Sequence, residues 1–162
     1  MILIAAVDRN WGIGKDNSLL FHIPADQRFF RETTTGNVVV MGRKTLESFP
    51  NGAPLKNRTN IVLSRNTSYH KEGITVFNDT ESLMKELSKY PADKVFCIGG
   101  AEIYKELLPF SDKALITKVD AVYEADAYFP DLDKTEGWEI TEMSEEQTCF
   151  DLVYHFITYE KK

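Results

Sequence analysis

Residues 95–104 have the sequence VFCIGGAEIY. The first four residues form a short β-rich run, Gly99-Gly100 interrupts it, and a helical pattern begins at Ala101. A strand that ends at one edge and passes straight into a helix is typical of α/β proteins, which bind ligands beyond the carboxyl ends of their strands. Glycines let a backbone approach a bound pyrophosphate closely, although a glycine pair alone more often marks only a tight turn.

Similar β-rich runs recur along the chain. They lie at residues 2–7, 38–41, 60–64, 74–77, 95–98, 114–119, 138–143 and 152–159. Helical patterns fill several of the gaps, at residues 25–34, 43–48, 80–89 and 101–107, and we expect Thr80 to cap the third helix. The first strands are apolar almost throughout, which favours parallel strands that are buried on both faces. The last two strands have no helix between them, so we expect an antiparallel addition at one edge.

These patterns predict an α/β fold. It is an eight-stranded, mostly parallel mixed sheet with an antiparallel C-terminal edge strand and about four flanking helices. A length of 162 residues suits one domain, spanning residues 1–162, with a substantial core.

The composition excludes several classes of protein. A net charge of −6 argues against general binding of nucleic acid or of anionic membranes. No apolar run approaches the length of a membrane span, and the apolar start is too short for a signal sequence. Cys97 and Cys149 lie far apart, as expected for small core residues in a reducing compartment, and we predict a cytoplasmic protein. The three histidines lack metal-ligand spacing, so we expect no metal.

Asp26 is the candidate acid of the chain. Pro24 suits the first turn of a helix, which would place Asp26, Phe29 and Phe30 on one face. A carboxylate among aromatic side chains is costly unless it is paired or takes up a proton, and such a group can take part in proton transfer. Acidic residues are, however, also common in first turns because they complement the helix dipole.

Residues 8–23 show no confident secondary structure, although they carry Gly12, Gly14 and the pair Asp16-Asn17. Loops of this length inside a compact domain are usually functional, and many are lids. Because this segment leads directly into Asp26, it favours the functional interpretation of that residue.

Three strand ends carry candidate anion sites. They are Gly42-Arg43-Lys44-Thr45, Ser64-Arg65 and Gly99-Gly100. Each is weak alone, but three equivalent sites in an acidic protein predict a ligand with several phosphates, such as a dinucleotide, lying across the sheet edge.

A second ligand would contact the helix of Asp26. Phe30, Phe49 and Leu55 could form its walls, with Arg58 at the mouth. The planar guanidinium of an arginine can grip a carboxylate, although an exposed arginine before a strand is the commoner case.

Over essentially its full length the chain resembles bacterial dihydrofolate reductases. The matching motifs occur in the family's order: Ile4-Ala5-Ala6, Ile13-Gly14, Ile23-Pro24-Ala25-Asp26, Phe30, Met41-Gly42-Arg43-Lys44-Thr45, Pro54-Leu55, Arg58, Asn60 to Arg65, Ile98 to Tyr104, Ile116-Thr117 and Phe129-Pro130. The resemblance implies reduction of 7,8-dihydrofolate to 5,6,7,8-tetrahydrofolate by hydride transfer from NADPH, in support of one-carbon metabolism and thymidylate synthesis. It further implies a monomer that binds dihydrofolate and antifolate inhibitors.

The resemblance also assigns roles to residues. Asp26 would be the catalytic acid, supported by Thr117, and Arg58 would bind the glutamate carboxylate. The other substrate contacts would be Ile4, Ala5, Gln27, Phe30, Ser48, Phe49, Leu55, Ile98 and Tyr104. Arg43, Ser64 and Arg65 would hold the 2′-phosphate, which implies NADPH rather than NADH. The remaining cofactor contacts would be Ala6, Ile13, Gly14, Gly42, Lys44, Thr45, Leu63, Ile98, Gly99, Gly100, Ala101, Glu102, Ile103 and Tyr104, with a cis peptide at Gly99-Gly100.

Some positions depart from the family pattern. Leu20-Phe21 replaces the usual Pro-Trp, Gln27 replaces a frequent leucine, and Ala125 replaces a frequent glycine. Because these changes alter the pocket rim and the lid, we predict reduced sensitivity to trimethoprim.

Two alternatives remain open from the sequence. One is a nucleotide- or folate-binding module without turnover, which would carry the same anion sites. The other is the related reductase domain of riboflavin synthesis, although the matches at Asp26, Phe30 and Arg58 favour folate recognition.

Overall fold

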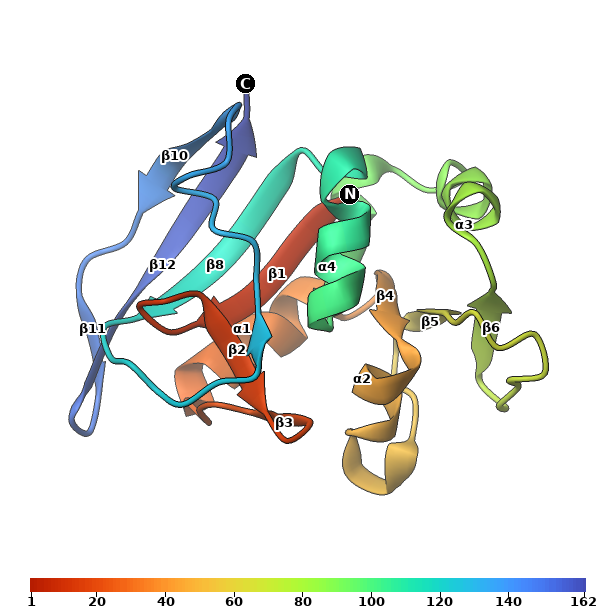
Figure 1. Ribbon diagram of the computed structural model, residues 1–162, viewed down its shortest axis with the longest axis horizontal. Coiled ribbons are helices and arrows are strands. Elements are labelled where there is room, and N and C mark those ends of the chain that lie inside the picture. Colours follow the sequence, from red (N-terminus) through yellow and green to blue (C-terminus); the bar gives the residue numbers. More distant parts are fainter.

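The computed structural model describes residues 1–162, which form a mixed sheet with helices on both faces (Figure 1). Six strands run parallel: β1 (Ile2–Val7), β4 (Val38–Gly42), β5 (Thr59–Leu63), β6 (Ile74–Phe77), β7 (Val95–Gly99) and β8 (Lys113–Val119). The strand order is β10-β12-β8-β1-β7-β4-β5-β6, which places β1 near the centre between β7 and β8. The predicted α/β fold with a mostly parallel sheet is confirmed.

The antiparallel end of the sheet has one more strand than the sequence indicated. β12 (Leu152–Lys161) pairs antiparallel with β8, and β10 (Trp138–Met143) pairs antiparallel with the outer side of β12. The short strand β11 (Gln147–Cys149) also pairs with β12. The C-terminal strand is therefore one position in from the edge, because β10 covers it.

Four α-helices flank the sheet, as predicted. Alternate side chains of β1 point to opposite faces, as the pleat of a strand requires. Leu3 belongs to the core beneath α3 (Thr80–Leu87) and α4 (Ala101–Leu107), whereas Ile4 packs with the aromatic side chains of α1 (Pro24–Thr34). The fourth helix is α2 (Arg43–Glu47), and three short 3₁₀ turns lie at Pro50–Gly52, Ala92–Lys94 and Leu108–Phe110. None of these helices has the length and apolar character to span a bilayer.

The predicted cap of α3 is wrong by one residue. Asp79, not Thr80, is the N-cap, and its carboxylate accepts a hydrogen bond from the Ser82 N–H at 2.7 Å. Aspartate serves this role as well as threonine does, so the sequence alone could not separate the two. The Thr80 hydroxyl is thereby free for another partner and donates to Glu106 Oε1 at 2.6 Å.

The segment between β1 and α1, which was expected to lack regular structure, forms a β-hairpin. Strands β2 (Gly12–Lys15) and β3 (Ser18–Leu19) pair antiparallel around Asp16 and Asn17, which have φ angles of 51° and 60°. Aspartate and asparagine tolerate this left-handed conformation, which two-residue hairpin turns require. β9 (Ala127–Tyr128) pairs with β2 and completes a small second sheet. Because a lid was predicted here, we call residues 8–23 the lid segment.

Candidate active site

Asp26 lies half-buried in the first turn of α1, facing β8. The Thr117 hydroxyl, which is 2% exposed, donates to Asp26 Oδ1 at 2.5 Å. Burial raises the pKa of the Asp26 carboxyl above its usual value, and the Thr117 hydrogen bond offsets part of that rise. No cationic side chain pairs with Asp26. The Asp26 carboxyl, bonded to Thr117, therefore has the properties of an acid that exchanges a proton or binds a ligand's N–H groups.

Two apolar clusters meet beside this acid. Phe30 packs with Ile4 in one cluster, and Phe49 and Leu55 pack in the other. Ile98, near the end of β7, belongs to both clusters. The structure thus brings together most of the apolar residues predicted to contact substrate.

Two other predicted substrate contacts are exposed. Gln27 Nε2 lies 3.4 Å from His22 Nδ1, which joins the lid segment to α1. The Ser48 hydroxyl donates to the carbonyl oxygen of Thr45 at 2.6 Å. Both residues are exposed, so any contact they make with a ligand would be at the protein surface.

Arg58 is held in place before any ligand arrives. Its Nε donates to the carbonyl oxygen of Lys56 at 2.9 Å, and its Nη1 donates to Thr34 Oγ1 at 3.1 Å. Partial burial lowers the pKa of Arg58 from its usual value, and the nearby charge of Arg31 contributes a second decrease. No carboxylate of the chain lies within 4.0 Å of the guanidinium. A fixed, unpaired guanidinium is suited to binding a carboxylate.

The sequence did not reveal Thr34 as the partner that fixes Arg58. The two residues are 24 positions apart, and Thr34 closes the last turn of α1, where a threonine usually bonds its own helix. The Thr34 hydroxyl also makes this local bond, because it donates to the carbonyl oxygen of Phe30 at 2.8 Å.

The backbone is accessible where β4 and β7 end. Gly42 and Gly100 begin α2 and α4, and neither helix has a side chain that caps its first N–H groups. A Cβ at Gly42 would lie 2.9 Å from Ile103 Cγ1, and one at Gly100 would lie 3.4 Å from Thr45 Oγ1. Because β4 and β7 are neighbours, these N–H groups share one edge of the sheet and fit a pyrophosphate. The predicted cis peptide at Gly99-Gly100 is also present.

The predicted cations of the cofactor side lie at the ends of β4 and β5. Arg43 Nε is 3.8 Å from Glu47 Oε1, and the Arg43 guanidinium lies 5.8 Å from the ring centroid of Tyr69. Arg65 follows β5 and pairs with Glu106 at 2.5 Å. Ser64 lies directly beside it and is 9% exposed. The pairing of adjacent strands places Arg43 and Arg65 at the same edge.

Tyr104 ties α4 to the central strand. Its hydroxyl donates to the carbonyl oxygen of Ile4 at 2.6 Å, and burial raises the pKa of Tyr104 well above its usual value. The hydroxyl is therefore used inside the protein, and any contact of Tyr104 with a ligand would come from its ring. Ala5 and Ala6 are half-buried in β1, while Ile13 packs into the core and Gly14 lies in the lid hairpin.

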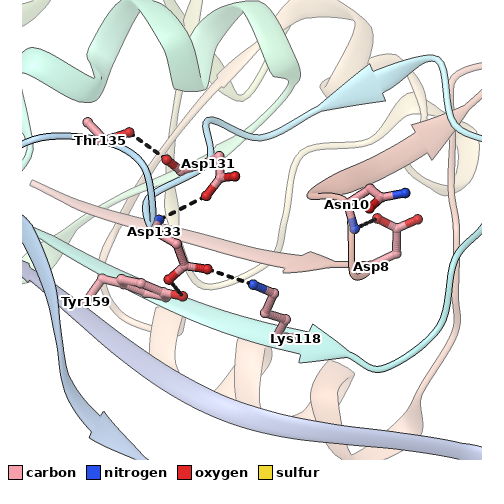
Figure 2. Close-up of polar contacts among 7 residues, drawn as sticks. All are labelled: Asp8, Asn10, Lys118, Asp131, Asp133, Thr135 and Tyr159. Carbon is pink, nitrogen blue, oxygen red and sulfur yellow. Dashed lines mark hydrogen bonds and ion pairs between the residues drawn. The ribbon is translucent and has the colours of Figure 1, made fainter.

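The lid segment is fixed at its base by two groups of contacts that the sequence did not reveal. In the first, the buried carboxylate of Asp8 accepts hydrogen bonds from the backbone N–H groups of Asn10, Gly12 and Tyr123 at 2.9, 2.7 and 3.0 Å. Figure 2 shows Asp8 and Asn10 at this turn.

In the second group, Trp11 packs beneath Lys118, whose Nζ lies 4.4 Å from the ring centroid. Lys118 also pairs with Asp133 at 2.9 Å, and the Tyr159 hydroxyl donates to the same carboxylate at 2.8 Å (Figure 2). Trp11 stacks on Phe129, with ring centroids 5.9 Å apart. The base of the lid is thus joined to both β8 and β12.

A family model described as dihydrofolate reductase matches residues 1–161. The chain belongs to the dihydrofolate reductase family. It is 41% identical over 160 residues to a dihydrofolate reductase of Haemophilus influenzae, covering 96% of each chain. It is 37% identical over 163 residues to that of Bacillus subtilis, covering 98% of this chain and 93% of the relative.

A solved structure shows the same fold. It is the dihydrofolate reductase of Enterococcus faecalis complexed with NADP(H) and RAB-propyl, which has 33% identity and a TM-score of 0.88. The match covers 99% of this chain and 95% of that one. Dihydrofolate reductases are NADPH-dependent oxidoreductases, so the predicted enzyme class and cofactor are confirmed.

Proposed function

We propose that the chain reduces 7,8-dihydrofolate to 5,6,7,8-tetrahydrofolate with NADPH, with Asp26 as its catalytic acid. The observation that carries the proposal is the half-buried Asp26 carboxyl, bonded to Thr117 and lacking any cationic partner. Its helix contributes Phe30 to an apolar cluster, and its partner Thr117 lies toward the carboxyl end of β8, the end at which β4, β5 and β7 carry the candidate phosphate sites. Bound NADPH supplies the hydride, and the protein supplies binding, orientation and the proton.

The proton step follows from the geometry of Asp26. Oδ1 accepts the Thr117 hydroxyl, which leaves Oδ2 for the N–H groups of a pterin ring. Burial raises the pKa of Asp26, so the carboxyl is protonated more readily than an exposed one and promotes protonation of the imine nitrogen, through a water molecule.

The remaining substrate contacts orient the molecule. Phe30, Phe49 and Leu55 surround the linker ring, and Arg58 holds the glutamate carboxylate with its pre-positioned guanidinium. A ligand fixed at both ends is held near a reactive geometry, which is the main contribution a protein makes to hydride transfer.

The cofactor half supports NADPH by its charges. Arg43, Ser64 and Arg65 lie at the ends of two paired strands and form the proposed site of the 2′-phosphate. The uncapped N–H groups after Gly42 and Gly100 receive the pyrophosphate.

The decisive experiment follows the NADPH absorbance band of the purified chain on addition of dihydrofolate. We expect a loss of absorbance that depends on both compounds. A folded protein that binds both without loss would be a binding module instead. Turnover only of the pyrimidine substrate of riboflavin synthesis would indicate the related reductase.

We further propose reduced sensitivity to trimethoprim. Phe21 packs edge-on against Tyr123, with ring centroids 5.2 Å apart, and offers no indole N–H to the pocket, while Gln27 makes the rim more polar. Restoring the family residues in a Leu20→Pro, Phe21→Trp, Gln27→Leu variant should lower the inhibition constant. A wild-type inhibition constant as low as that of a typical bacterial relative would contradict the proposal.

We also propose that the protein acts as a cytoplasmic monomer that binds small molecules and no nucleic acid. Its acidic net charge of −6 supports the last point. Sedimentation equilibrium at micromolar concentration tests the oligomeric state, and a dimer mass would contradict it.

A further inference from the structure

Arg65 and Glu106 form the shortest ion pair of the chain, with 2.5 Å between Nη2 and Oε1. The Thr80 hydroxyl donates to the same oxygen at 2.6 Å. The three residues come from the end of β5, the start of α3 and the end of α4, so their contact is set by the fold rather than by local sequence. Glu106 is therefore a fixed acceptor inside the proposed 2′-phosphate site.

The two members of the ion pair differ in freedom. The Arg65 side chain is 71% exposed, whereas that of Glu106 is 27% exposed. Only Nη2 of the guanidinium has a partner within the chain, so the other donors face solvent and can take a second acceptor. Arg65 can thus reach a phosphate without leaving Glu106.

Glu106 is the carboxylate that pairs with Arg65. The pKa of nearby Asp79 is lower than usual, first because the Ser82 backbone N–H donates to it, and the charge of Arg65 makes only the smallest contribution. The 2.5 Å of the Arg65–Glu106 pair is shorter than the 3.8 Å between Arg43 and Glu47.

We propose that Glu106 is a specificity-determining residue that weakens the preference for NADPH over NADH. The 2′-phosphate brings negative charge to a cation that Glu106 already offsets, and the like charges repel. The 2′-hydroxyl of NADH meets no such conflict, because acidic side chains accept hydrogen bonds from ribose hydroxyls in NAD sites. Glu106 also holds Arg65 in place, which favours phosphate binding. This gain in affinity is smaller than the loss from repulsion, since an exposed ion pair contributes little. The inference rests on the proposed assignment of Arg65 to the 2′-phosphate.

The test is Glu106→Gln, which keeps the size of the side chain and an oxygen that still accepts from Thr80 and Arg65. We expect the ratio of kcat/KM with NADPH to kcat/KM with NADH to rise about five- to tenfold. Calorimetric titration should show adenosine 2′,5′-bisphosphate binding more tightly to the variant, with adenosine 5′-monophosphate unaffected. The matched control is Glu86→Gln, which removes one charge from the ion pair of Glu86, on α3, with Lys89 beyond the end of that helix and should change neither measurement.

An unchanged ratio, or a ratio that falls, would overturn the proposal; a fall would show that Glu106 instead positions Arg65 for the phosphate. The calorimetric comparison does not require turnover. Failure of this inference is therefore distinguishable from failure of the proposed reductase activity, which would appear as no NADPH oxidation by the wild-type chain. Thermal unfolding of both variants confirms that they are folded.

Discussion

The proposed substrate half and the proposed cofactor half of the site use charge in opposite ways. Asp26 is half-buried, has no cationic partner and has a raised pKa, so burial determines its protonation state. The side chains of Arg43 and Arg65 are 42% and 71% exposed, and both are already paired with carboxylates of the chain. Surface pairs of that kind respond to salt and to added charge, whereas a buried acid responds to pH. The difference predicts separate responses of the two halves to mutation and solution conditions.

The largest expected effect comes from Asp26→Asn. Loss of the acid should lower kcat at neutral pH by roughly 10²- to 10⁴-fold, the usual contribution of general acid catalysis. The loss should shrink at low pH, where the substrate arrives already protonated. Steady-state kinetics across pH, with NADPH affinity measured by calorimetry, checks this outcome. A loss of NADPH affinity as large as the loss of kcat would show that Asp26 has a structural role. The two proposed halves of the site would then not respond separately to mutation.

Arg58→Met should act on substrate binding alone. A hydrogen bond to a charged group contributes about 1.5–3 kcal/mol, so KM for dihydrofolate should rise about 10- to 100-fold with kcat nearly unchanged. The matched control is Arg28→Met, which removes an exposed arginine from α1. A similar rise in both variants would mean that general positive charge, rather than the fixed Arg58, attracts the substrate.

Salt should separate the two halves without any mutation. The Debye length is about 10 Å at 0.1 M salt and about 3 Å at 1 M, so exposed pairs are screened while the buried acid is not. Raising the salt concentration tenfold should weaken NADPH binding several-fold, roughly 3- to 10-fold, and the binding of pteroate, which lacks the glutamate, less than about twofold. Calorimetric titrations at both salt concentrations measure the two dissociation constants. An equal fold-change for NADPH and for pteroate would contradict the proposed difference between the two halves.

The smallest expected effect is on stability. The folded-state pKa of Asp26 lies above its unfolded value, so between the two values the folded chain binds more protons and stability falls as pH rises. Asp26→Asn should therefore unfold at a higher temperature at neutral pH, by on the order of 2 °C, with the difference vanishing in acid. Calorimetric melts over a pH series test this. A less stable variant at neutral pH would mean that the Thr117 hydrogen bond outweighs the cost of burial.

The sheet was predictable because its strands carry a local signal. Runs such as residues 38–41 are apolar at every position, and burial on both faces strongly favours apolar side chains. Pro24 also marked the start of α1 correctly, since proline acts through its own backbone. The positions of Asp26 and Arg58 followed from the same local patterns and from the resemblance to the family.

The resemblance to the family predicted the contact of Thr117 with Asp26, but other contacts that fix the site were not predictable, because they join distant segments. β2 is only four residues long, and its partner β9 comes more than 100 residues later, so neither shows a strand pattern alone. The same holds for Thr34 with Arg58 and for Thr80 with Glu106. The Thr34 hydroxyl keeps its local bond to Phe30 and gains Arg58 as a second partner, whereas the Thr80 hydroxyl bonds to Glu106 instead of capping its helix; only the folded chain supplies these partners.

The position of Trp11 gives the lid an intrinsic optical probe. The chain has only two tryptophans, and the other, Trp138, lies on the edge strand β10. A cation 4.4 Å from the indole ring shifts its excited state, so the emission of Trp11 depends on where Lys118 lies. A Trp138→Phe variant would contain a single emitter at the base of the lid. Its emission spectrum would then report any movement of the lid segment relative to Lys118 during turnover, with no attached dye.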